Sequence, residues 1–111
     1  MCRLPAPTTE AEELARLQQR AAKGDARAQL NLGTAYAEGK FGLKIDKKKA
    51  LYYLSLSAEQ CDANAQFNLG FLYYHGDGTE RDVGEALRLF ELAATQGHQQ
   101  AQEALAILKG A

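Results

Sequence analysis

One segment of the chain occurs twice, and this repetition limits the possible folds more than any other feature of the sequence. The segment from Asp25 to Tyr36 returns as the segment from Asp62 to Tyr73, with eight of the twelve residues identical. The similarity continues beyond this segment, and the first copy has one extra residue in a loop. Such a repeat predicts an array in which one small structural unit packs on the next.

Each copy has the pattern of two helices. Ala28, Leu32 and Tyr36 recur at every fourth position, as one face of a helix requires. Asp25 stands where a helix N-cap is expected, and Gly39 stands where the chain leaves a helix through a left-handed residue. The second copy has these features at Asp62 and Gly76. A second helix is expected to begin at Asp46 in the first copy and at Asp82 in the second. The predicted buried faces of these second helices are Ala50, Leu54, Ser57 and Ala58 in the first copy and Ala86, Phe90, Ala93 and Ala94 in the second.

Two glycines inside the first helices carry specific information about packing. Gly33 and Gly70 follow a leucine in the two copies. A glycine in a helix interior costs about 1 kcal/mol relative to alanine. Because both copies keep it, we expect the backbones of two helices to approach closely at these positions.

The pattern extends beyond both copies and defines the predicted domain. Thr9 and Glu12 give a start signal for a helix over residues 9–23 that resembles the second helix of a unit. The sequence predicts an all-α fold, a short α-solenoid of antiparallel helical hairpins with about six helices. It divides into a disordered tail at 1–8 and one helical-repeat domain at 9–109, which comprises a half-repeat at 9–23, full repeats at 24–60 and 61–97, and a half-repeat at 98–109.

The order of these positions resembles the Sel-one-like repeat, a relative of the tetratricopeptide repeat. The resemblance covers most of the chain and implies helical hairpins stacked into a curved solenoid that serves as an adaptor or scaffold for other proteins. The sequence departs from the family at Cys61, which replaces the junction glycine kept at Gly24 and Gly97. In the first copy the family positions are Ala26, Ala28, Leu32, Gly33, Tyr36, Gly39, Gly42, Asp46, Ala50, Leu51 and Ala58.

The resemblance also implies where a partner binds. In tetratricopeptide-like arrays the first helix of each hairpin lines the concave side, and the groove residues lie between the motif positions. The aromatic residues there have two interpretations: Phe67 and Phe71 belong to the core between units, or Phe71 or Tyr74 is an exposed anchor. The predicted groove residues are Arg27, Leu30, Asn31 and Thr34 in the first unit and Asn64, Phe67, Asn68, Phe71, Tyr74 and His75 in the second, followed by Gln100 and Glu103 in the last helix.

The leading hypothesis for function is a non-enzymatic protein-protein interaction module that holds a partner protein or peptide on this concave face. One alternative is an inhibitor or immunity-type protein that caps a partner enzyme, as some bacterial relatives do. A remote alternative is a hydrolase of the β-lactamase or penicillin-binding kind, because some cysteine-rich relatives have been linked to those activities. The sequence has neither a G-x-S-x-G nor an S-x-x-K motif, so no catalytic residue is predicted.

Cofactors, nucleic acid and membranes are not expected partners. The soft metal ligands are Cys2, Cys61, His75 and His98, without the spacing of a metal site, so we predict no metal and no cofactor. The net charge of -1 gives no electrostatic reason for binding nucleic acid or an anionic membrane. The basic run of Lys44 with Lys47, Lys48 and Lys49 is interpreted as a solvated loop and helix edge, with a binding role as the alternative. Without a signal peptide or an apolar span, the protein is expected to be cytoplasmic. The sequence is compatible with both a monomer and a homodimer.

Overall fold

Six α-helices follow one another without a strand in residues 9–110, the part of the chain that the computed structural model describes. The prediction of an all-α solenoid is therefore confirmed, whereas the predicted tail at 1–8 lies outside the described residues. None of these helices is long and apolar enough to cross a membrane. The helices are α1 (Glu10–Ala22), α2 (Ala26–Glu38), α3 (Lys47–Glu59), α4 (Ala63–His75), α5 (Val83–Thr95) and α6 (Gln99–Leu108).

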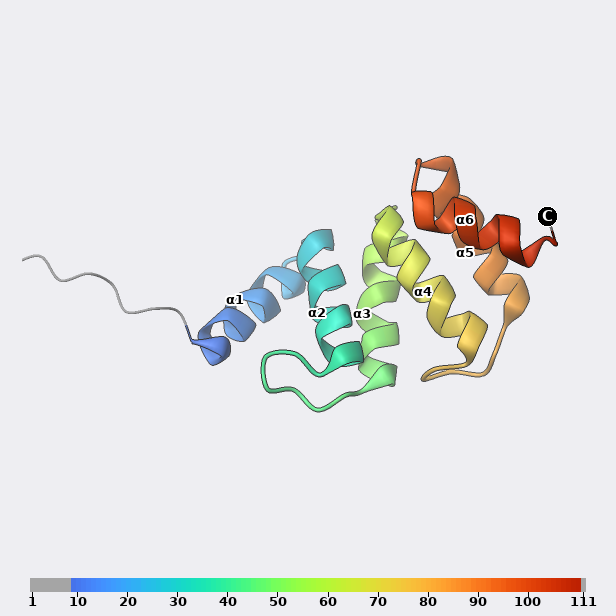
Figure 1. The fold of residues 1–111 in the computed structure, drawn as a ribbon. Coiled ribbons are helices and arrows are strands. Elements are labelled where there is room, and N and C mark those ends of the chain that lie inside the picture. The colour runs from blue at the N-terminus through green and yellow to red at the C-terminus, as the bar shows by residue number, and fades with distance from the viewer. Residues whose placement is uncertain (1–8, 111) are drawn as a thin grey trace, which may run out of the picture.

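The helices form an elongated stack in which each packs mainly on its neighbours in the chain. The most extensive contacts join α2 to α3 and α4 to α5, the two hairpins that the repeat predicts. Helix α1 packs on α2 and helix α6 packs on α5, so each hairpin is flanked by one further helix (Figure 1). The molecule measures 65 × 27 × 23 Å along its principal axes. A stack of this shape exposes long faces that run across several helices.

The predicted helix ends are confirmed by hydrogen bonds. The Asp25 carboxylate accepts from the backbone N–H groups of Arg27 and Ala28, at 3.0 and 3.1 Å. Asp62 caps α4 by accepting from the N–H of Ala65 at 3.0 Å. Asp46 and Asp82 cap α3 and α5 in the same way. The helices α2 and α4 both end at a glycine with a left-handed backbone, at φ 74° and 69°.

Close packing within each hairpin explains the repeated glycines. A Cβ atom placed on Gly33 would lie 2.8 Å from Cγ of Leu54, and one placed on Gly70 would lie 2.9 Å from Cε1 of Phe90. Real carbon contacts are longer than this, so only glycine allows α2 to meet α3, and α4 to meet α5, at these distances. The expectation of a close approach at Gly33 and Gly70 is confirmed.

Glutamine side chains connect successive units at the junctions. The buried Gln29 amide donates to the carbonyl of Ala21 at the end of α1, at 3.2 Å. Its Oε1 atom accepts from the amide of Gln60 at the end of α3, at 2.7 Å. The next unit repeats the second contact between Gln66 and Gln96, at 2.8 Å. These bonds satisfy buried polar groups and connect α2 to α1 and α3, and α4 to α5.

Candidate functional site

The predicted binding residues lie on α2 and α4, on a surface that we call the first-helix face because α2, α4 and α6 form it. Most of them are accessible. Asn31 and His75 are exposed, and Tyr74 and Asn68 are half-buried. Along this face Thr34, Phe71 and Ile107 occupy equivalent positions of successive first helices. Also exposed are Arg27, Asn64, Phe71, Gln100 and Glu103, and also half-buried are Thr34 and Phe67.

Leu30 does not lie on this face, and its prediction as a groove residue is wrong. The side chain is only 6% exposed and belongs to the core cluster that contains Leu54 and Leu69. The position is covered because α4 of the next unit contributes Ala65 and Leu72 to the same cluster. Burial of a leucine stabilises the stack through its apolar area and leaves no surface for a partner.

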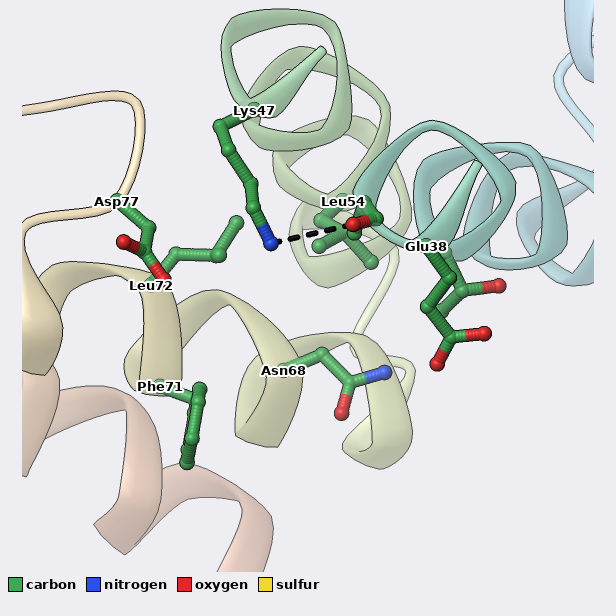
Figure 2. A pocket seen from close by; sticks show the side chains of 9 residues that line it. Glu38, Lys47, Leu54, Asn68, Phe71, Leu72 and Asp77 are labelled. Carbon is green, nitrogen blue, oxygen red and sulfur yellow. Dashed lines mark hydrogen bonds between the residues drawn. The ribbon is translucent and has the colours of Figure 1, made fainter. Parts of the chain in front are cut away.

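A first hollow opens between α2 and α4 and has a volume of about 200 Å³ (Figure 2). Polar groups stand around its opening: the Lys47 ammonium donates to the carbonyl of Ala37 at 3.1 Å, and Asn68 and Asp77 lie beside it. No carboxylate of residues 9–110 lies within ion-pair distance of the Lys47 ammonium. The lining residues are Thr34, Ala37, Glu38, Lys47, Leu54, Asn68, Phe71, Leu72 and Asp77.

A second hollow lies between α4 and α6, has a volume of about 270 Å³ and is lined mainly by apolar atoms. Phe71 forms a wall of both hollows. Its side chain is 48% exposed, and Ile107 on α6 is 76% exposed. The second hollow is lined by Phe67, Phe71, Tyr74, His75, Phe90, Ala104, Ile107 and Leu108.

The two interpretations of the aromatic residues apply to different members of the group. Phe67 packs against Phe90 of the same hairpin, with ring centroids 5.5 Å apart, and stacks on His98 at the start of the next unit, so it contributes to the packing within and between units. The ring centroids of Phe71 and His75 are 4.3 Å apart, and about half of the Phe71 side chain is exposed to solvent. Tyr74 is held from one side by the Arg81 guanidinium, 5.1 Å from the ring centroid. The ring with the most accessible apolar surface on this face of α4 is therefore that of Phe71.

His98 fixes the start of α6 and one edge of the face. Its Nδ1 atom accepts from the N–H of Ala101 at 3.1 Å, where α2 and α4 use an aspartate. Its Nε2 atom lies 3.0 Å from Oδ1 of Asn64, and its ring stacks on Phe67 at 4.9 Å. Because Nδ1 accepts, the proton of the neutral ring resides on Nε2 and is donated to Asn64. Asn64 therefore also holds α6 in place.

Several residues that line the hollows were not predicted as groove residues, among them Ile107, Lys47 and Asp77. Ile107 could have been found by extending the repeat alignment into the last helix, where it falls at the position of Phe71. Lys47 was assigned to a solvated run, although its stem crosses the first hollow. Asp77 lies in a loop, and no periodic pattern indicates where a loop side chain points.

The geometry provides two neighbouring hollows with an aromatic ring between them and amide, ammonium and carboxylate groups at the rim. Apolar hollows with a few polar groups are suited to holding side chains of a protein segment. Among the described residues, no three side chains of histidine, cysteine, aspartate or glutamate gather as a metal site would require.

Comparisons with known proteins agree with this architecture. The family model described as Sel1 repeat matches residues 26–60 and 63–98. A Sel1 repeat protein from Oxalobacter formigenes is similar in structure, with a TM-score of 0.80 and 32% identity over 86% of this chain. The protein c5321, described as a protective antigen of uropathogenic Escherichia coli strains with an SLR fold, has a TM-score of 0.88 and 33% identity over 93% of this chain. The chain spans 39% and 22% of the lengths of these two proteins, and the comparison with curated proteins gives no match.

Proposed function

The chain belongs to the Sel1 repeat family, and on that premise we propose that it binds a segment of a partner protein on the first-helix face, around Phe71. Sel1 repeat proteins are generally protein-interaction modules. The proposal assigns that general role to one surface, the first-helix face, and to one central contact residue, Phe71. Its support comes from the surface itself, because the same fold can carry unrelated functions.

The observation that carries the proposal is the exposed ring of Phe71 between two hollows. An aromatic ring contributes nothing to the core where it faces water, but it supplies a large rigid apolar surface to a partner. Residues of this kind at the centre of an interface contribute a large share of its binding free energy. Ile107 extends the apolar surface to the next helix.

The polar groups at the rim suit a backbone or polar side chains of the partner. Asn68 has an amide that can both donate and accept, and within residues 9–110 the Lys47 ammonium donates to Ala37 alone, which leaves two of its donors for a partner. Asp77 lies on the opposite side of Lys47 from Glu38 in Figure 2. A segment that places an apolar side chain on each side of Phe71 can therefore form hydrogen bonds along the same path.

The test replaces Phe71 with alanine and measures capture of the partner. Photo-crosslinking from position 71 identifies the bound protein, and isothermal titration then compares wild-type and Phe71→Ala proteins. We expect the substitution to weaken binding by at least about tenfold, or about 1.4 kcal/mol. The melting temperature is expected to change little, because the ring is 48% exposed in the free protein.

Leu92→Ala is the matched control, because Leu92 is also an exposed apolar residue but lies on α5, away from both hollows. We expect this variant to capture the same partner with unchanged affinity. Unchanged affinity of Phe71→Ala for the crosslinked partner contradicts the proposal. A large loss of stability in Phe71→Ala assigns the ring to the core instead.

A further inference from the structure

A second surface, formed by α1, α3 and the Tyr36 side of α2, shares no lining residue with the two hollows of the first-helix face and carries three tyrosines and two lysines. The rings of Tyr36 and Tyr53 stack in parallel at 5.8 Å, and Tyr52 meets Tyr53 edge-on at 5.0 Å. The Lys49 ammonium lies 5.3 Å from the centroid of Tyr36. Together with Lys48 these residues line a hollow of about 460 Å³, which we call the tyrosine-lysine groove.

The tyrosine-lysine groove is the basic end of a longer depression, and the other end of that depression is an uncharged hollow. Tyr52 and Tyr53 also form a wall of an adjoining hollow of about 380 Å³, which α1 lines with Gln18 and Ala21 and which none of the charged side chains in the described part of the chain lines. The two hollows therefore join along the tyrosines. Tyr52 is 59% exposed at the point where they meet.

The charge at the basic end is not neutralised within the described residues. No carboxylate of residues 9–110 lies within ion-pair distance of Lys48 or Lys49. Asp46 also lines the hollow, but its carboxylate accepts from the backbone N–H of Lys49 at 3.1 Å as the cap of α3. Burial raises the pKa of Tyr53, and the nearby Tyr36 and Tyr52 raise it further, so its hydroxyl stays protonated and can donate.

The second repeat shows that the fold does not require this arrangement. At the positions of Lys49 and Tyr52 it has Glu85 and Arg88, and these two side chains form an ion pair with each other. At the position of Lys48 it has Gly84. The second repeat thus pairs the two charges at these positions, whereas the first repeat presents Lys48 and Lys49, without an ion-pair partner in residues 9–110, beside an exposed aromatic ring.

We propose that the tyrosine-lysine groove binds an acidic segment of a partner protein, with carboxylates at Lys48 and Lys49 and an apolar side chain on Tyr52. Charge complementarity favours this occupant, because paired opposite charges guide association and select the partner. Lys49 is already held over the Tyr36 ring, so less side-chain entropy is lost when a carboxylate arrives. The adjoining uncharged hollow accommodates the apolar part of the segment.

The test transplants the ion pair of the second repeat into the first. The variant Lys49→Glu with Tyr52→Arg recreates the pair of Glu85 and Arg88, and Lys44→Gln, in the preceding loop, is a control with the same change in net charge. A phage-displayed library of random peptides is selected on the wild-type protein. We expect selection of peptides rich in aspartate and glutamate that also contain an aromatic residue or leucine. The double variant is expected to bind the best of these, as a synthetic peptide, at least about tenfold more weakly.

Further measurements make the outcome decisive. Phe71→Ala and Lys44→Gln are expected to bind the acidic peptide like wild type, and added salt is expected to weaken binding. Absence of acidic peptides from the selection, or equal binding by the double variant, overturns the proposal. Displacement of the peptide by millimolar inorganic phosphate assigns the groove to a phosphate ligand and also overturns it. If the double variant unfolds at a lower temperature, Lys48→Ser with Tyr52→Ser, which alters exposed side chains only, provides the same comparison.

Discussion

At the scale of single residues, the junction between the two copies holds a side chain in a conformation that glycine normally adopts. Cys61 has φ 67°, and its equivalents Gly24 and Gly97 have φ 92° and 87°. A left-handed backbone brings the Cβ atom of an ordinary residue close to the following carbonyl, at a cost of about 1–2 kcal/mol. Cys61 keeps the hydrogen bond of the junction in spite of this cost, because its N–H donates to Ala58 at 2.9 Å as those of Gly24 and Gly97 donate to Ala21 and Ala94 at 3.0 Å.

Replacing Cys61 with glycine is expected to stabilise the protein by about 0.5–1 kcal/mol, since relief of the left-handed strain exceeds the extra entropy of an unfolded glycine. The measurement is the free energy of unfolding in urea. Cys61→Ala is the control, because it removes the thiol and keeps the Cβ atom, and it is expected to give no gain. Equal stabilisation by both variants contradicts the role given to the backbone.

The close contact at Gly70 predicts a cost for even one added methyl group. A Cβ atom there would meet the Phe90 ring and also the carbonyl oxygen of Ala86 at 3.2 Å, and a backbone atom cannot move aside easily. We expect Gly70→Ala to destabilise the protein by about 1–3 kcal/mol. Gly84→Ala, on the exposed side of α5, has space and is expected to stabilise by up to about 1 kcal/mol. Similar melting temperatures for the two variants contradict this reading of Gly70.

At the scale of single helices, the start of α2 couples stability to pH. The N–H of Ala28 and the guanidinium of Arg20 bind the Asp25 carboxylate and lower its pKa below the ordinary value of 3.8. A lowered pKa in the folded state means that this stabilisation is complete above about pH 4. It is lost as the pH falls through the lowered value, because the unfolded chain takes up the proton first.

Asp25→Asn is therefore expected to flatten the fall in stability below about pH 4, while it keeps an N-capping side chain at the start of α2. Urea unfolding at a series of pH values measures this slope. Arg20→Gln removes one cause of the lowered pKa and is expected to flatten the slope in part. An unchanged slope in Asp25→Asn shows that other carboxylates are responsible for the acid sensitivity.

Most helix ends were predictable from the sequence, because the same capping residue appears twice at the same position. Asp25 and Asp62 illustrate this, as both cap a first helix. His98 has the same role at α6, but a histidine gives no capping signal when the sequence is inspected for aspartate, asparagine or serine. The burial of Leu30 was not predictable either, because it depends on the next unit packing over α2. Local patterns indicate which face of a helix is apolar, whereas stacking decides which apolar positions stay accessible.

At the scale of the whole molecule, helix packing is almost entirely between chain neighbours, so the end helices have less support than the central ones. Helix α1 packs mainly on α2 and helix α6 mainly on α5, whereas α3 and α4 have extensive contacts on two sides. In such an array stability is the sum of the units and their interfaces. Native-state hydrogen exchange is expected to show lower opening free energies for amides of α1 and α6 than for those of α3 and α4. A uniform opening free energy across all six helices contradicts this nearest-neighbour description.

The position of Phe71 in two hollows at once has a thermodynamic consequence. A ligand group in the hollow beside Lys47 and another in the hollow beside Ile107 contact opposite sides of one ring. The first group to arrive restricts the rotation of that ring and changes the wall that the second group meets. The two hollows therefore share a coupling free energy, and removing ligand groups singly and together is expected to give non-additive losses of affinity. On the proposed function, we expect the two cavities to recognise a pair of side chains in a fixed order through this one ring, rather than each side chain independently.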